Sequence, residues 1–358
     1  MFAYFTIAVS LANPPIVQDD LAPSADGRPT IDKIINGQSA TPDDFPSTGG
    51  MLMSGIIFDY PFQSFVCSST LIAPDVVLLA AHCLDDAAFT FGFGEVEDKQ
   101  VYWTRSADLT SWDGQTTDPP LPNDTIEAVD WTLHEEFDMQ SLSMGLANNK
   151  DIALLFLSEA VLDIEPAYLP TASEGSALQT GDSVYVVGWG QQSATGWNEQ
   201  PPAGSYGIKQ QGESFIAEIN EYEFKVGDAQ SDVRKCHGDS GGPSFWDSGS
   251  GLLLIGVTSH AYDESDCFET GGVDTRVDYY LNWINEEMTA RCSDGTRVWC
   301  EEPGILPYGY FQDESDLDED EPTEEDGKIL GCSATAFSLV WYIPFVSAVI
   351  IRRREQSI

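Results

Sequence analysis

The sequence predicts an all-β fold, because short apolar segments alternate with turn-forming residues over most of its 358 residues. Each segment has the length of a single strand, and glycine, proline, asparagine or aspartate residues separate the segments. In the first half, the expected strands are residues 50–58, 65–72, 76–81, 89–93 and 152–157. In the second half, they are residues 184–187, 207–219, 222–226, 252–259 and 273–277. Many short strands at this spacing are typical of a β-barrel or a β-sandwich.

Two segments depart from the strand pattern. Residues 278–290 carry Leu281, Ile284 and Met288 on one face at helical spacing, so we expect a terminal helix packed on the second half. The long polar stretch between residues 82 and 151 includes residues 113–120, DGQTTDPP, which predict a surface loop. That loop could border a binding cleft or be a decoration of the surface.

The composition excludes one large class of partners. The chain has 59 acidic and 16 basic residues, for a net charge of −43. Phosphate contacts require a basic face, so we expect no binding to nucleic acid. An acidic, solvated surface instead keeps an exported protein soluble. Seven cysteines in the chain indicate an oxidising compartment.

The first 33 residues are expected to lie outside the fold. Residues 1–12 form an apolar run that ends in small residues, which predicts a secretory signal peptide, although no basic residue precedes the run. A buried strand is the alternative for this run. Residues 13–33 are rich in proline, aspartate and small residues, as in a flexible pro-segment.

The stretch CHGDSGGP, residues 236–243, carries the strongest chemical signal. Glycines on both sides of Asp239 and Ser240 predict a tight, open turn that exposes the serine hydroxyl. The amides of Gly238 and Ser240 could point into one hollow and stabilise an oxyanion. A serine hydroxyl is a weak nucleophile alone, so a base and a group that orients the base are required.

Two further motifs supply these groups. AAHC, residues 80–83, contains His82, and DIALL, residues 151–155, begins with Asp151. The three motifs in the order histidine, aspartate, serine resemble the chymotrypsin/trypsin family of serine proteases over roughly residues 34–290. This resemblance implies two antiparallel β-barrels with a C-terminal helix. His82 and Asp151 would belong to the first barrel and Ser240 to the second.

The resemblance also assigns the chemistry. Ser240 attacks the peptide carbonyl, His82 accepts its proton, and Asp151 orients the imidazole. Gly238 and Ser240 form the oxyanion hole. No cofactor and no metal are expected, because no two cysteines have the close spacing of a zinc site.

The family pattern pairs six of the seven cysteines. The implied disulfides are Cys67–Cys83 around the histidine, Cys236–Cys267 around the nucleophile turn, and Cys292–Cys300 after the helix. Cys332 is left over.

Residues 33–37, KIING, resemble the activation site of the same family. Cleavage after Lys33 would free the α-amino group of Ile34, which could pair with a buried Asp239 and shape the oxyanion turn. An ordinary strand start is the alternative for this stretch.

The resemblance places Arg234, six residues before the nucleophile, at the base of the primary substrate pocket. The pocket walls would be Ser259, His260, Ala261 and Gly272. A basic floor would favour an acidic residue before the scissile bond, through a charge-assisted pair. Alternatively, Arg234 is neutralised internally, with Asp274 as its candidate partner. If Arg234 repels cations, the enzyme cannot cut after its own Lys33, so we expect a separate trypsin-like protease to activate it.

The C-terminal part divides into three segments. The expected protease domain covers residues 34–291, and residues 292–330 form a small cysteine loop and an acidic, disordered linker. Residues 331–358 combine Gly331-Cys332, an apolar run and three arginines, which predicts a transmembrane segment with a cytoplasmic end. This segment resembles the MYXO-CTERM type of bacterial sorting signal, in which Cys332 would be a processing or lipid-attachment point; a permanent anchor is the alternative.

Together these patterns predict a serine endopeptidase, secreted or tethered to the cell surface, outer membrane or periplasm by its C-terminal segment. Its partners would be protein or peptide substrates and the activating protease, and we expect a monomer. The alternative, from another class, is a catalytically silent homologue that acts as a binding module. A hydrolase acting on esters would share the same chemistry.

Overall fold

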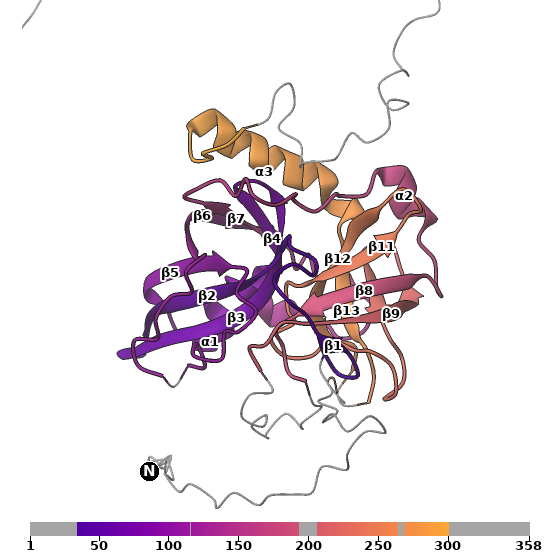
Figure 1. Ribbon diagram of the computed structural model, residues 1–358, viewed down its shortest axis with the longest axis horizontal. Coiled ribbons are helices and arrows are strands. Elements are labelled where there is room, and N and C mark those ends of the chain that lie inside the picture. Colours follow the sequence, from indigo (N-terminus) through magenta and orange to yellow (C-terminus); the bar gives the residue numbers. More distant parts are fainter. Residues whose placement is uncertain (1–33, 115, 193–205, 264–266, 268, 301–358) are drawn as a thin grey trace, which may run out of the picture. The chain divides into compact units, whose positions relative to one another are not determined.

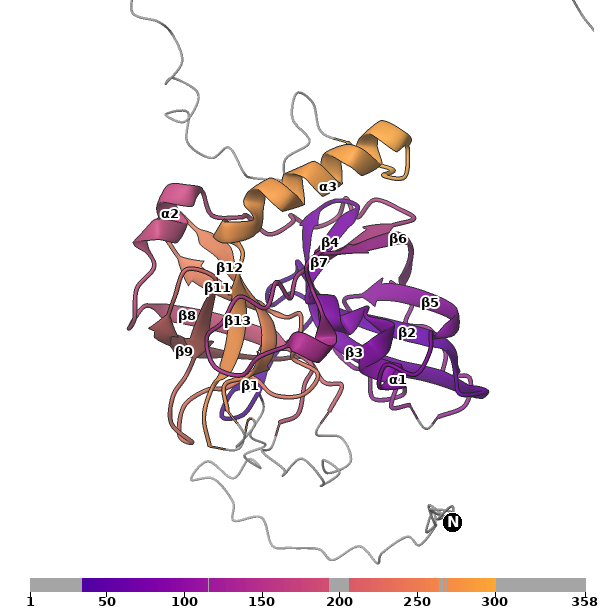
Figure 2. The same ribbon diagram turned by 180° about the vertical axis from the view of Figure 1, so that it is seen from behind.

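The computed structural model describes residues 34–114, 116–192, 206–263, 267 and 269–300 (Figures 1 and 2). The expected signal peptide and pro-segment (residues 1–33), the greater part of the acidic linker, and the anchor segment (residues 331–358) lie outside these residues. Within the described part of the chain, no helix is both long and apolar enough to cross a membrane.

The first half of the described chain forms a closed antiparallel barrel in the order β2-β3-β4-β7-β6-β5. Its strands are β2 (Thr48–Ile57), β3 (Tyr60–Ala73), β4 (Val76–Leu79), β5 (Glu97–Thr104), β6 (Ile126–Leu133) and β7 (Ala153–Leu157). The β2–β3 hairpin turns through Phe58 and Asp59, which both have positive φ (51° and 68°). A two-residue turn of this hand matches the twist of the strands that it joins.

The second half forms another closed antiparallel barrel. Its strands are β8 (Ser183–Gly188), β9 (Gln210–Ile219), β10 (Glu223–Val226), β11 (Pro243–Asp247), β12 (Leu252–Ala261) and β13 (Gly272–Arg276). They follow the order β9-β10-β13-β12-β11-β8, and the β8–β9 pairing closes the sheet. The short β1 (Gln38–Ser39) adds to the edge of β9. The all-β, two-barrel fold that the sequence predicts is thus confirmed.

The strand prediction was wrong in the segment that follows His82. Residues 89–93 are not a strand: α1 (Asp86–Thr90) begins after Asp85, whose side chain accepts a hydrogen bond from Ala87 N, and ends at Phe91 with φ 54°. The polar stretch between His82 and Asp151 contains β5 and β6 rather than loop alone. Most residues of these two strands are exposed or only partly buried, and polar residues interrupt their apolar ones, so the strand signal was weak.

The terminal helix α3 (Leu281–Asp294) buries Leu281, Ile284 and Met288, as the sequence predicts. Its packing differs from expectation, because these side chains join an apolar cluster built largely from the first barrel. Arg291 of α3 bonds to Asp130 on β6 at 3.1 Å and lies over the ring of Phe156 on β7. Figure 1 shows the helix above β4, β6 and β7. The helix therefore stabilises both barrels.

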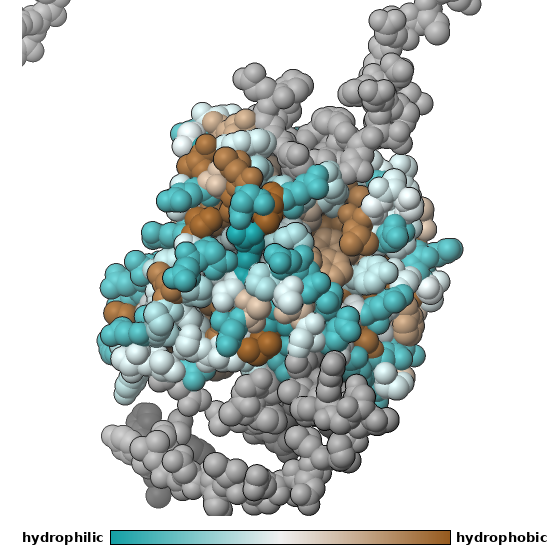
Figure 3. Space-filling model, in the orientation of Figure 1, coloured by the Kyte–Doolittle hydropathy of each residue, from teal (hydrophilic) through white to brown (hydrophobic). Residues whose placement is uncertain are grey.

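The surface is consistent with the acidic composition. In the face drawn in Figure 3, hydrophilic residues predominate and apolar residues gather only in small patches.

The chain that follows α3 is fixed to the first barrel. A disulfide joins Cys292 to Cys300, and the loop that it closes presents Arg297 to the buried Asp75. Arg297 Nη2 and Nε lie 2.7 Å and 3.1 Å from Asp75 Oδ1, while Trp299 N donates to Oδ2 at 2.9 Å. Both side chains are fully buried, so each charge depends on the other for compensation.

We predict that Arg297→Ala lowers the free energy of unfolding by about 3–5 kcal/mol, because it leaves Asp75 buried and unpaired. Arg105→Ala is the matched control, since Arg105 pairs with the exposed Asp163 and its loss should cost below about 1 kcal/mol. Urea denaturation of both variants measures the difference. Equal destabilisation would contradict the assignment of Arg297 to a buried pair.

Candidate active site

The turn that carries Ser240 is held rigidly between the barrels. Gly238 has φ 92°, and a Cβ at this position would lie 3.0 Å from the Cα of Gly190, so only glycine fits. Asp239 N donates to Cys236 O at 2.9 Å and Gly242 N donates to Asp239 O at 2.8 Å, which closes the turn. From the first barrel, Ser68 donates to Gly238 O through its backbone N (3.1 Å) and its hydroxyl (2.9 Å).

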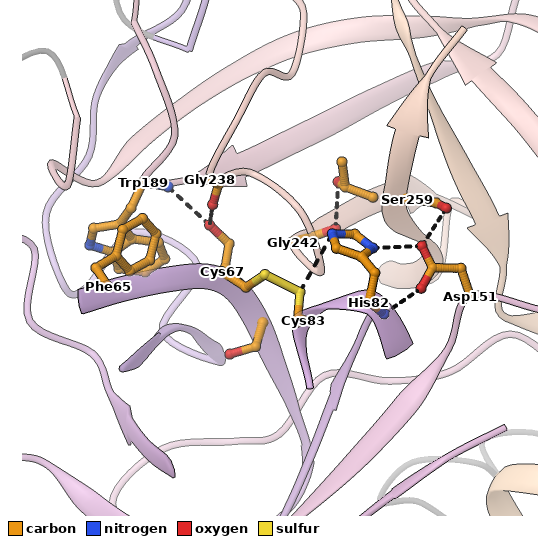
Figure 4. Close-up of a disulfide and its surroundings, with 12 residues drawn as sticks. Phe65, Cys67, His82, Cys83, Asp151, Trp189, Gly238, Gly242 and Ser259 are labelled. Carbon is orange, nitrogen blue, oxygen red and sulfur yellow. Dashed lines mark hydrogen bonds and ion pairs between the residues drawn. A yellow bond between two sulfur atoms is a disulfide. The ribbon is translucent and has the colours of Figure 1, made fainter. Parts of the chain in front are cut away.

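His82 and Asp151 meet in the first barrel. His82 lies in η1 (Ala81–Cys83), just after β4, and Asp151 lies just before β7; β4 and β7 are paired strands. The imidazole Nδ1 lies 2.7 Å from Asp151 Oδ2, and the backbone N of His82 donates to Oδ1 at 2.9 Å. Ser259 from β12 of the second barrel donates its hydroxyl proton to Oδ2 at 2.6 Å. Figure 4 shows His82 between the Cys67–Cys83 disulfide and Asp151, with Ser259 beyond the carboxylate.

The environment sets the protonation of both groups. Burial lowers the pKa of His82, but the charge and hydrogen bond of Asp151 outweigh burial, so the net pKa lies above the ordinary 6.5. Burial raises the pKa of Asp151, but His82 and Ser259 outweigh it, so the net pKa lies below 3.8. Asp151 therefore stays ionised and favours the charged imidazole.

Ser240 opens on the same pocket as His82. This pocket has a volume of about 280 Å³. Within the described residues, no hydrogen bond joins Ser240 Oγ to His82 Nε2, and Nε2 lies 3.9 Å from Cys83 Sγ. Hydrogen bonds of this kind are often long without substrate and tighten when substrate binds.

The three expected disulfides are all present in the structure. Cys67–Cys83 fixes η1 against β3, and Cys236–Cys267 fixes the nucleophile turn. Each pair lies close to a histidine, His82 or His237, in a group that resembles a metal site by distance alone. The sulfur atoms are bonded to each other and offer no thiolate ligand.

Asp239 is a fully buried carboxylate. Its oxygens accept hydrogen bonds from Gly190 N (2.8 Å) and Cys236 N (2.9 Å), and none of the described residues forms an ion pair with it. Burial raises its pKa to about 6. Ile34 is also fully buried, and Ile35 O accepts a hydrogen bond from Arg234 N at 3.1 Å. Ile34 of the expected activation segment therefore packs in the core of the second barrel, whereas Asn36 is exposed.

Four of the five residues expected around the substrate pocket line it: Ser259, His260, Ala261 and Gly272. Arg234 does not. Its side chain is buried behind the wall and donates to the carbonyls of Gln230, Cys267 and Thr270 at 3.1, 2.8 and 3.3 Å. The expected pairing of Arg234 with Asp274 is also wrong, because Asp274 pairs with Lys235 at 2.7 Å.

Lys235 takes the place that we expected for Arg234. It lines the pocket, and its Nζ also lies 2.9 Å from Ser244 Oγ. Successive residues of an extended segment point to opposite sides. Whether Arg234 or Lys235 faces the pocket therefore depends on the register of the segment, which the sequence does not show.

Three apolar pocket residues were also missed: Met139, Leu142 and Met144. They lie in the segment that contains the short 3₁₀ helix η2 (Met139–Ser141), which has no periodic signal in the sequence. The same loop region begins near His134. Its side chain is only 12% exposed and packs against Tyr280 and Trp283.

Two closed barrels with His82 and Asp151 on one and Ser240 on the other define a chymotrypsin-like fold. The family model for trypsin matches residues 34–284 of the chain. The chain belongs to the trypsin family of serine endopeptidases.

Curated relatives share about a quarter of their residues with this chain. Phenoloxidase-activating factor 3 of Holotrichia diomphalia is 27% identical over 240 residues, which cover 63% of this chain and 65% of that protein. Brachyurin of Leptuca pugilator is 26% identical over 270 residues, with 71% and 98% covered. Chymotrypsin of Phaedon cochleariae is 26% identical over 279 residues, with 75% and 85% covered. The chain thus spans just under two thirds of the first of these relatives.

We predict that the pKa of His82 exceeds 6.5 and that Asp151→Asn lowers it, because the ion pair is lost while burial remains. A raised folded-state pKa means that this pair's contribution to stability is complete below about pH 6.5 and is lost as the pH rises through the folded value. Titration of the imidazole by NMR in Ser240→Ala protein measures both values. Asp247→Asn, which changes an exposed aspartate, should leave the pKa of His82 unchanged; a fall as large as that in Asp151→Asn would contradict a specific pair.

Proposed function

We propose that the chain hydrolyses peptide bonds in protein or peptide substrates through Ser240, His82 and Asp151. The observation that carries this proposal is the buried Asp151 carboxylate, 2.7 Å from the imidazole of His82, which shares a pocket with Ser240. This is the arrangement that a weak hydroxyl nucleophile requires.

In this mechanism Ser240 Oγ attacks the substrate carbonyl while His82 Nε2 accepts the hydroxyl proton. Asp151 holds the Nδ1 proton and stabilises the imidazolium. The amides of Gly238 and Ser240 stabilise the oxyanion, and within the described chain neither amide donates to another protein group. His82 then protonates the leaving amine, and water hydrolyses the acyl-enzyme by the reverse sequence.

We also propose activation by cleavage after Lys33, which lies outside the described residues. A buried carboxylate with a pKa raised to about 6 is costly to ionise, so Asp239 would gain stability from a nearby cation. The buried position of Ile34 supports this, since cleavage would create an α-ammonium at that residue.

Labelling with a fluorophosphonate probe tests both proposals. We expect slow reaction of the full chain before cleavage, and fast reaction at Ser240 after cleavage at Lys33. Asp239→Asn should suppress the gain on cleavage, and Ser240→Ala should abolish labelling.

The outcomes separate the alternatives. No labelling after cleavage would favour the catalytically silent homologue. Equal labelling before and after cleavage would refute the activation step alone.

The pocket contacts argue against a preference for acidic residues before the scissile bond, which is one of the two alternatives that the sequence left open for Arg234. Preference for acidic residues rested on Arg234, whose guanidinium is bound to backbone carbonyls. Among the described residues, Lys235 and Asp274 at the pocket floor neutralise each other. We therefore propose that uncharged side chains are preferred before the scissile bond. Cleavage after Lys33 would then require a separate protease, as the sequence predicts.

A panel of peptides that differ only before the scissile bond tests this preference. We expect turnover after leucine or phenylalanine to exceed that after lysine by at least roughly tenfold, because the lysine charge would be buried without a partner. In Lys235→Ala the Asp274 carboxylate loses its partner, so relative turnover after lysine should rise. Fastest cleavage after glutamate would restore Arg234 as the determinant.

Export and tethering complete the proposal. The three disulfides of the described chain support an oxidising compartment outside the cytoplasm. We propose that residues 1–12 direct export and that residues 331–358 tether the monomer, either as an anchor or as a signal processed at Cys332.

A further inference from the structure

His260 lies beside the active site but has no place in the mechanism above. It belongs to β12, where the register with β13 shifts between Thr258 and His260, so that Ser259 forms a β-bulge. A bulge interrupts the alternation that sends neighbouring side chains to opposite faces of a strand. As a result, Ser259 Oγ and His260 Nδ1 lie 2.9 Å apart.

The second ring nitrogen of His260 reaches another element. His260 Nε2 lies 3.0 Å from the carbonyl oxygen of Gly145, in the loop of residues 138–149, here called the pocket loop. This loop supplies Met139, Leu142 and Met144 to the wall of the substrate pocket, and Met144 is 59% exposed. His260 therefore connects the pocket wall to Ser259, and through Ser259 to Asp151.

The hydrogen bonds along this connection determine the protonation state of the His260 imidazole. The Ser259 hydroxyl has one proton, and its oxygen lies 2.6 Å from the ionised Asp151, so the proton is directed to the carboxylate. Ser259 Oγ must then accept a hydrogen bond from His260 Nδ1. Gly145 O is also an acceptor, so Nε2 must donate as well. Only an imidazole protonated on both nitrogens makes both bonds.

Other contacts hold the pocket loop in place for this interaction. Gly145 N donates to Tyr262 O at 2.8 Å, next to the His260 contact. The buried carboxylate of Glu223 on β10 accepts hydrogen bonds from Ala147 N (2.6 Å) and Asn149 N (3.2 Å). Both contacts tie the loop to the second barrel, and Asn149 is two residues before Asp151.

We propose that His260, protonated on both ring nitrogens, is a positioning residue that joins the pocket loop to Asp151. This inference rests on the proposed peptidase function and adds a residue to it. The Nδ1 proton keeps the Ser259 hydroxyl directed at Asp151, and the Nε2 proton holds the pocket loop closed against β12.

Loss of one proton from His260 breaks one of these two bonds. If Nδ1 loses its proton, Ser259 is drawn away from Asp151; if Nε2 loses it, the pocket loop is released. Asp151 faces His260 through Ser259, and the other titratable groups on the pocket are His82, His237 and Lys235, the last paired with Asp274. The proposal therefore links substrate binding to a protonation outside the catalytic triad.

NMR of the imidazole nitrogens tests the protonation directly. The chain has only four histidines, so single His→Gln variants in the full-length Ser240→Ala chain assign every signal. At the pH of maximal activity of the active enzyme, we expect both nitrogens of His260 to show the shifts of protonated nitrogen. A neutral imidazole, with one unprotonated nitrogen at that pH, would overturn the proposal.

Kinetics of His260→Phe tests the role. Phenylalanine keeps a ring of similar shape but donates no hydrogen bond, so KM should rise and kcat/KM should fall roughly tenfold or more. In the parent enzyme, kcat/KM should also fall in the pH range where NMR shows His260 losing a proton, and this fall should be absent from His260→Phe. His134→Gln, which removes a histidine that does not line the pocket, should leave both KM and the pH profile unchanged.

The tests of His260 can fail independently of the proposed peptidase function. Failure of the fluorophosphonate probe to label Ser240 would refute the peptidase, whereas the protonation state of His260 is read in a chain without the nucleophile. A doubly protonated His260 whose replacement leaves KM and the pH profile unchanged would refute the positioning role alone.

Discussion

The Asp151 carboxylate is the point on which the active site depends. It is fully buried, and it collects donors from both barrels: His82 from the first and Ser259 from the second. Its backbone carbonyl also accepts a hydrogen bond from Thr275 on β13 at 3.0 Å. A buried carboxylate is costly unless its oxygens are satisfied, so the interface between the barrels and the ionised state of Asp151 stabilise each other.

Other buried polar groups between the barrels are also satisfied by hydrogen bonds from the opposite barrel. Ser68 of the first barrel holds the carbonyl of Gly238 in the nucleophile turn and also accepts a hydrogen bond from Trp189 N. Glu223 of the second barrel holds the backbone of the loop before Asp151. Each catalytic segment is therefore fixed partly by the opposite barrel, and a site of this kind requires both barrels to fold and to dock together.

The sequence predicted the two-barrel fold, and it singled out His82, Asp151 and Ser240 as candidates, because both inferences rest on local patterns. Strand periodicity and the motifs around the three residues are each contained within a few neighbouring positions. The errors came from contacts between distant segments. Asp274 could be paired with either Arg234 or Lys235 until the direction of each side chain was known, and the bulge at Ser259 that brings His260 into contact with Ser259 has no sequence signature. The strands β5 and β6 were missed because most of their residues are exposed or only partly buried, which leaves little apolar periodicity in the sequence.

The clamp formed by Arg297, Asp75 and the Cys292–Cys300 loop has a mechanical consequence. A force on the chain beyond residue 300 is divided between the disulfide, which passes it to Cys292 in α3, and the buried Arg297–Asp75 ion pair, which passes it to the first barrel. The load would thus enter the protein far along the sequence from the turn around Ser240. Under the tethering proposed above, the nucleophile turn would therefore lie outside the direct path of the load.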